Sequence, residues 1–197
     1  MKSFKKISLS FLIMISAVTY AQEFDANLQL RPRFEYRNGY KNLISNGEEA
    51  TSFISQRSRL NFNFGQDKLK TKLTLQNVRT WGDVATTTAS DKNGIAIFEA
   101  WAQYDLNPEW STRIGRQVIS YDNQRILGEI DWSQQGQSHD AALISFHRKS
   151  NQLDLGFALN ANAENLVAPK TPYTTNYKSM QYAWYHTKLD KVGMSLL

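Results

Sequence analysis

Apolar and polar residues alternate along most of this chain with a period of two. In residues 26–37, ANLQLRPRFEYR, one face is apolar throughout and the other carries mainly charged and amide side chains. Such alternation predicts a β-strand with one face on each side of a sheet. Soluble strands average about 5–6 residues, and a tilted membrane strand needs about 9–11. The twelve residues of this segment therefore favour a strand that crosses a membrane.

The same pattern recurs along the chain. Further strands are predicted at 57–64, 69–76, 97–106, 110–118 and 152–161, at 140–148 and 178–187 with less regular faces, and at 192–197, where the chain stops in mid-pattern. In 97–106, Phe98 falls on the apolar face with Ala100, Ala102 and Tyr104. We therefore expect an all-β, antiparallel transmembrane β-barrel, with eight to nine strands here as the N-terminal part of a larger barrel. A complete eight-stranded barrel is the alternative.

Short and long connections alternate strictly between these strands. The turns at 65–68, 107–109, 149–151 and 188–191 are short, and the loops at 38–51, 81–94, 121–139 and 161–177 are long. Outer-membrane barrels have short periplasmic turns and longer extracellular loops. We therefore expect the mature chain to begin on the periplasmic side.

Residues 1–21 form a separate segment. Three lysines precede an apolar run of 12 residues and small residues before Gln22, the pattern of a secretory signal peptide. The run is shorter than the about 20 residues of a spanning helix, so residues 22–197 are the expected barrel domain. Without the signal peptide the chain has 20 basic and 18 acidic side chains, and this small excess does not indicate nucleic acid as a partner. The chain has no cysteine, so no disulfide supports the exported fold.

If the apolar faces meet lipid, the polar faces line a lumen. Alternation then points eight basic side chains inward against Glu35, Glu99, Asp105 and Asp154. These basic residues, the candidate substrate-binding groups of the lumen, are Arg31, Arg33, Arg37, Arg57, Arg59, Lys70, Lys72 and Arg113. A basic channel in a low-dielectric wall concentrates anions, and arginine binds carboxylates through two parallel hydrogen bonds.

Pairing with the inward acids is the alternative role for each of these cations. On two adjacent strands, however, Arg31, Arg33, Arg57 and Arg59 have only Glu35 near them. Because like charges across strands are destabilising, we expect another group to offset this cluster.

The segment 115–140, GRQVISYDNQRILGEIDWSQQGQSHD, holds the residues that could carry chemistry. Ser138, His139 and Asp140 have the residue types of a catalytic triad, but neighbours on a strand point to opposite faces. Asp122, Glu129 and Asp131 could supply a glycosidase pair, which needs carboxyl groups about 5–9 Å apart, a weak signal for any acidic loop. The three histidines lack the close spacing of metal ligands. We therefore expect no catalytic residue, metal or cofactor.

This segment resembles the signature region of the alginate-export family of outer-membrane porins. The resemblance rests on Gly115-Arg116-Gln117, on Arg125 after a glutamine, and on Gly128, Trp132, Gly136 and Asp140, and it is most specific over 113–146. RPRFEYR and FEAWAQYDL are similar to the family's early strands. It covers the chain from about residue 24 to the end, as the N-terminal half of a typical member.

The resemblance implies a monomeric barrel of about eighteen strands with an arginine-rich lumen that passes an anionic polysaccharide, without enzymatic activity or cofactor. Arg116 and Arg125 match the motif's arginines and would face the substrate inside, and Asp140 matches its closing acid and would orient an arginine. Trp132 would either stack on sugar or anchor the loop, and anchoring is the favoured interpretation.

Alternation from Arg113 conflicts with an inward Arg116, because it places that side chain on the lipid face, where charge is costly at the bilayer midplane. Either a bulge at Gly115 turns Arg116 inward, or the strand has reached the membrane interface there. We further expect the loop 121–139 to fold inward and narrow the pore.

The sequence thus predicts an outer-membrane porin, in contact with membrane lipid, for facilitated diffusion of an anionic, alginate-like polysaccharide or oligosaccharide. Two alternatives stay open: an outer-membrane enzyme acting on glycan or lipid, and a soluble exported β-sandwich that binds glycans.

Overall fold

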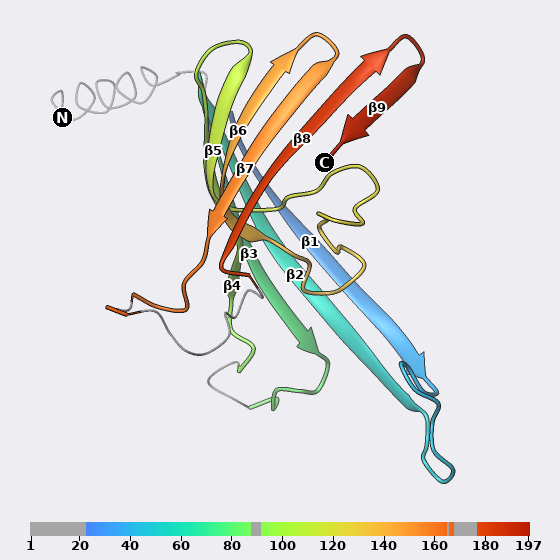
Figure 1. Ribbon diagram of the computed structural model, residues 1–197. Coiled ribbons are helices and arrows are strands. Elements are labelled where there is room, and N and C mark those ends of the chain that lie inside the picture. The colour runs from blue at the N-terminus through green and yellow to red at the C-terminus, as the bar shows by residue number, and fades with distance from the viewer. Residues whose placement is uncertain (1–22, 88–91, 165, 168–176) are drawn as a thin grey trace, which may run out of the picture.

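The computed structural model describes residues 23–87, 92–164, 166–167 and 177–197, which form one nine-stranded antiparallel sheet (Figure 1). Each strand pairs with the next one along the chain. The strands are β1 (Glu23–Arg37), β2 (Thr51–Gln66), β3 (Leu69–Thr80), β4 (Ala96–Asp105), β5 (Trp110–Gln117), β6 (His139–Arg148), β7 (Asn151–Leu159), β8 (Ser179–Leu189) and β9 (Val192–Leu196). The all-β, antiparallel fold predicted from alternation is confirmed, and the ninth segment is a strand.

Several expectations concern residues outside the described ranges. The signal peptide over 1–21 lies outside them, and so does most of the loop predicted at 161–177. No helix in the described part of the chain is long and apolar enough to cross a membrane. Between the described strands β1 and β9 no pairing occurs, so the sheet is open and curved (Figure 1).

The connections separate to two ends of the sheet. The β4–β5, β6–β7 and β8–β9 turns lie together at the top of Figure 1, and the β1–β2 and β3–β4 loops extend at the bottom. This arrangement agrees with the alternation of short and long connections in the sequence.

The two faces of the sheet differ in chemistry. Cross-strand pairing aligns Leu28 with Leu60 and Leu60 with Leu75 on one face, here called the outer face. The other, the inner face, aligns Gln29 with Arg59 and Arg59 with Gln76. Leu28 is 69% exposed, whereas the largest fully buried side chains are Arg57, Gln117 and Thr74. A soluble protein shows the opposite distribution, so this sheet turns its apolar face toward a non-aqueous surrounding.

Aromatic residues mark the outer face near the short turns. Phe24 pairs with Phe64, and Trp110 pairs with Phe146 at a ring-centroid distance of 4.9 Å. Tyr104 and Tyr185 continue the row on β4 and β8. Aromatic girdles of this kind lie at the membrane interfaces of outer-membrane barrels.

One residue lies on the face opposite to that predicted. The pairing of β3 with β4 shifts between Thr74 and Leu75, which face Glu99 and Ile97, so Phe98 is an extra residue. A bulge of this kind changes the direction of a side chain. Phe98 is therefore buried on the inner face, not exposed on the apolar face as alternation predicted.

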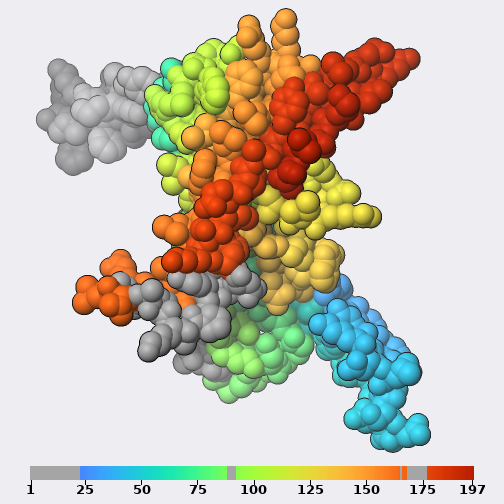
Figure 2. Space-filling model, in the orientation of Figure 1, coloured from blue at the N-terminus to red at the C-terminus, as the bar shows by residue number. Residues whose placement is uncertain are grey.

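The segment between β5 and β6, residues 118–138, does not extend from the sheet as the β1–β2 loop does. It turns back in front of the inner face (Figure 1), and in the space-filling view it is the yellow region between β8, in red, and the blue N-terminal strands (Figure 2). We call it the inner loop. The inward folding expected from the sequence is therefore observed.

Candidate functional site

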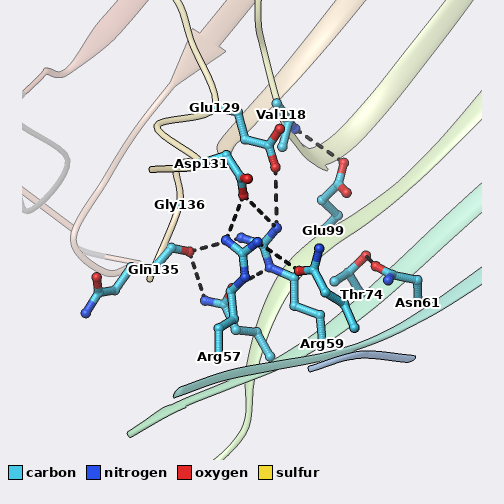
Figure 3. Close-up of polar contacts among 12 residues, drawn as sticks. Arg57, Arg59, Asn61, Thr74, Glu99, Val118, Glu129, Asp131, Gln135 and Gly136 are labelled. Carbon is cyan, nitrogen blue, oxygen red and sulfur yellow. Dashed lines mark hydrogen bonds and ion pairs between the residues drawn. The ribbon is translucent and has the colours of Figure 1, made fainter. Parts of the chain in front are cut away.

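Three arginines that alternation placed on the inner face hold the inner loop against β1 and β2, and Figure 3 shows two of them, Arg57 and Arg59. Arg31 donates from Nη1 to the carbonyl of Asp131 at 2.7 Å and from Nε to the side chain of Gln134 at 3.1 Å. Its partner across the strands, Arg57, lies with Nη1 2.7 Å from Asp131 Oδ1. Side chains of β1 and β2 that lie 100 and 74 positions before Asp131 in the sequence therefore fix the loop.

Arg57 is the most completely buried of these groups, with no exposed surface. Its Nη2 donates to Gln29 Oε1 at 2.8 Å, while its buried Nε has no hydrogen-bond partner in the described residues. A buried cation is costly unless it is paired. The Asp131 carboxylate therefore offsets the free-energy cost of burying the Arg57 charge.

Arg59 makes a second attachment one step along the same strand. Its Nε donates to Gln76 Oε1 at 2.6 Å, and its Nη1 lies 3.3 Å from Glu129 Oε1 (Figure 3). The guanidinium also stacks over Phe98, 3.6 Å from the ring centroid. A cation over an aromatic face is stabilised by the ring quadrupole, so the bulge that turns Phe98 inward contributes to the attachment.

Glu129 and Asp131 bring two negative charges to the cluster of three arginines. Burial raises the pKa of Asp131, but the contact with Arg57 and the charges of Arg57, Arg31 and Arg59 outweigh it, and the pKa is lowered. The carboxylate is therefore ionised at neutral pH. The alternative of pairing with acids applies to Arg31, Arg57 and Arg59, and the acids come from the inner loop rather than from the strands.

Aromatic contacts fix the other end of the inner loop to β7 and β8. Tyr121 donates to Asp154 Oδ2 at 3.0 Å and stacks on Trp184 with a centroid distance of 4.6 Å. Trp184 in turn donates from Nε1 to Asp122 Oδ2 at 3.0 Å. Burial, then the hydrogen bond with Tyr182 and the charge of Asp154, raise the pKa of Tyr121. The phenol therefore stays protonated and keeps donating.

Between the two attachments, the loop forms an exposed turn that carries Arg125. A backbone hydrogen bond from Tyr121 to Leu127 closes this turn at 3.2 Å. Arg125 is exposed, and its guanidinium has no partner among the residues that the structure describes. Of the residues carried over from the resemblance, Arg125 is the one that presents an uncompensated charge.

Arg33 and Arg37 lie farther along β1 and share one acid. Arg33 Nη2 lies 2.8 Å from Glu35 Oε1, and Arg37 Nη2 lies 2.6 Å from Glu35 Oε2. Arg33 also donates to the carbonyl of Trp132 at 2.7 Å. One carboxylate cannot neutralise two guanidinium groups, so this pair keeps net positive charge.

The remaining predicted cations of the strands have partners close by. Lys70 Nζ lies 3.0 Å from Asp105 Oδ2, and Lys72 forms an ion pair with Glu99. Arg113 donates to Gln103 Oε1 at 2.8 Å and covers the ring of Trp101. They lie on the inner face, as predicted, but not in the arginine cluster.

Arg116 and Asp140 lie on the outer face, which corrects the expectation that they point inward. Arg116 pairs with Ala100 on one side and with Asp140 on the other, and the register continues unbroken through Gly115. No bulge therefore turns Arg116 around. Arg116 Nη1 lies 2.8 Å from Asp140 Oδ2, and both side chains are largely exposed. Asp140 does orient an arginine, but on the other side of the sheet.

Trp132 does not anchor the loop with its ring, contrary to the interpretation favoured from the sequence. Its side chain is 74% exposed, and only its backbone carbonyl takes part in the attachment. The attachment instead uses Gln134, which is buried and donates to the hydroxyl of Ser55 at 2.9 Å. Sequence reasoning missed Gln134, Tyr121 and Trp184 because neither alternation nor charge distinguishes them.

The residues considered for catalysis either contact other side chains or lie on opposite faces of the sheet. Asp122, Glu129 and Asp131 contact Trp184, Arg59 and Arg57. His139 lies inward, with Nδ1 2.9 Å from Tyr177 Oη, while Asp140 lies on the opposite face. The described residues contain no group of three or more possible metal ligands.

Comparison with known proteins supplies a family. The family model described as alginate export matches residues 22–160, which is more than half of the chain. No curated protein matches. The family is one of transport porins rather than enzymes, and it supports a role in polysaccharide export through the outer membrane. The match covers β1 to β7 and the whole inner loop, and this chain belongs to the alginate-export family.

Proposed function

We propose that this chain forms the N-terminal part of a monomeric outer-membrane porin of about eighteen strands, which passes an anionic, alginate-like polysaccharide by facilitated diffusion. Residues 1–21 would direct export, and the outer face would contact membrane lipid. The observation that carries the proposal is the inner loop. It is attached across the polar face by buried arginines, while Arg125 stays exposed at its turn.

The inner loop changes the charge available to a substrate. It adds Asp122, Glu129 and Asp131 against one arginine, Arg125, so the positive excess on the inner face is smaller than the strands alone indicate. The part of this excess most open to solvent lies at Arg125 and at the Arg33–Arg37 pair. We therefore assign substrate contact to Arg33, Arg37 and Arg125.

The other inward cations have different roles in this proposal. Arg31, Arg57 and Arg59 are positioning residues that hold the inner loop in the pore. Lys70 and Lys72 are paired with acids, Arg113 is held by a neutral amide, and all three line the path toward the periplasmic turns. The substrate then meets a narrowed passage with localised positive charge, which attracts anions without a continuous basic surface that would retain them.

Single-channel recording tests this proposal. The protein in a planar bilayer under a salt gradient should give a reversal potential on the anion-selective side, and added oligo-uronate should interrupt the current. A neutral oligosaccharide of the same length is the control. A cation-selective channel, or a current that oligo-uronate leaves unchanged, contradicts the proposal.

A further inference from the structure

A groove opens on the inner face between the ends of β1 and β2 and the inner loop. Its volume is about 630 Å³, and it is lined by Arg33, Glu35, Arg37, Tyr40, Phe53 and Trp132 among others. Small-molecule sites commonly have volumes of about 300–1,000 Å³. The groove therefore has room for a short stretch of a sugar chain.

Trp132 lines this groove with an exposed ring on a fixed backbone. Arg33 holds its carbonyl, and Arg31 holds the carbonyls of Asp131 and Ser133 on either side. The indole is nevertheless 74% exposed. Because the backbone is already ordered, a ligand that covers the ring would lose little conformational entropy of the protein on binding.

The charged wall of the groove has unused hydrogen-bonding capacity. Arg37 lies over the rings of Tyr40 and Phe53, with centroid distances of 4.3 and 4.6 Å, and shares Glu35 with Arg33. Its Nε and Nη2 donate to Glu35, whereas Nη1 makes no hydrogen bond within the described ranges. The two aromatic rings hold the guanidinium in place, and one carboxylate leaves the pair with net positive charge.

We propose that this groove is a binding subsite for one residue of a uronic-acid oligosaccharide. The C–H face of the pyranose ring stacks on Trp132, and the sugar carboxylate accepts a charge-assisted hydrogen bond from Arg37. The class of sugar rests on the proposed function, whereas the subsite rests on the exposed ring and the partly unpaired guanidinium. A neutral sugar would keep the stacking and lose the carboxylate bond.

Equilibrium binding to the full chain in detergent micelles tests the subsite. Titration calorimetry with a tri-uronate should show about tenfold weaker binding for Trp132→Ala, the loss expected from one stacking contact, and less than about threefold for Trp132→Phe. Arg37→Gln should weaken binding of the tri-uronate about tenfold and leave a neutral trisaccharide unchanged. Trp81→Ala is the matched control, because Trp81 is also exposed but bonds Gln56 on the outer face.

Folding and function are measured beside binding. Trp132→Ala should keep the heat-modifiable gel migration of the wild type, because the side chain takes no part in the loop attachment. If oligo-uronate blocks the wild-type channel but Trp132→Ala binds tri-uronate with wild-type affinity, the subsite is wrong and the porin proposal stands. If the wild type neither binds nor is blocked by uronate, both proposals fail.

Discussion

Arg57 Nη1 lies 2.7 Å from Asp131 Oδ1, and this ion pair joins a completely buried strand side chain to a carboxylate that is 51% exposed. The two partners are unequal. Arg57 depends on the pair because water cannot reach it, whereas Asp131 could be solvated without it. The pair therefore makes the position of the inner loop depend on one residue of that loop.

Replacing Asp131 with asparagine should release this part of the inner loop. The substitution leaves the Arg57 charge buried without its partner, which is strongly unfavourable in a dry site, but exposure of Asp131 reduces the effect. We expect the free energy of unfolding to fall by about 1–2 kcal/mol, measured by urea titration in micelles, together with a larger and noisier single-channel current.

Asp140→Asn is the matched control for that experiment. It removes an ion pair of similar length with Arg116, but both partners are exposed, so the change should stay within about 0.5 kcal/mol. Equal losses for the two variants would show that burial of Arg57 does not set the strength of the loop attachment.

The Arg57–Asp131 ion pair should make the stability of the loop attachment depend on pH. The pKa of Asp131 is lowered in the folded protein, relative to about 3.9 in an unfolded chain. Its contribution to stability is therefore fully present above about pH 5 and is lost as the pH falls through the lowered pKa, below about pH 4. Current noise recorded from pH 7 downward should rise in that range.

In Asp131→Asn, this acid-dependent rise in noise should be absent, because the titrating group is gone. A variant with the same pH profile as the wild type would assign the transition to another carboxylate.

Arg125→Ala should weaken anion selectivity, since Arg125 is exposed at the turn of the inner loop and has no partner among the described residues. We expect the anion-to-cation permeability ratio to fall by roughly a factor of two, because one unscreened charge is lost from a narrow passage. The reversal potential under a salt gradient measures this ratio.

Arg116→Ala removes the same charge from the outer face and should leave the reversal potential unchanged. If Arg116→Ala changed selectivity as much as Arg125→Ala, the assignment of the two arginines to opposite faces would be wrong.

Gly136→Ala should disturb the inner loop by two separate effects. Gly136 has a φ of +70°, and an added Cβ would lie 2.5 Å from Arg59 Nη2 and 3.0 Å from the Phe98 ring. Arg59 is buried and bonded, so it cannot move away easily. We expect a loss of about 2–4 kcal/mol in the free energy of unfolding from backbone strain and overpacking together.

Gly82→Ala separates these effects, because Gly82 has a φ of +84° and an added Cβ would meet nothing within 4 Å. It should cost about 1–2 kcal/mol, the strain alone. Similar losses for both variants would mean that the contact between the inner loop and Arg59 is looser than the structure indicates.

The sequence predicts the arginines of the site but not their partners. Alternation predicts Arg31, Arg57 and Arg59 together on the inner face, and their like charges predict an offsetting group. The structure has both. Their partners Glu129 and Asp131 were considered for catalysis instead, because the sequence of an acidic loop does not show which basic side chains it will contact in the fold. Contact with substrate at Arg33, Arg37 and Arg125 stays a prediction.

The sequence by itself determined the strands, the face of most side chains and the alternation of short and long connections. These are local properties, because a strand exposes its side chains with a period of two. Alternation alone places Arg116 outward, where the structure has it, but the expectation taken from the resemblance, that Arg116 points inward, was wrong. Only the tertiary structure decided that Phe98 turns inward and that the inner loop occupies the arginines. A bulge depends on the pairing of two strands, and the loop contacts join residues 70 to 103 positions apart. A local sequence pattern therefore predicts neither of them.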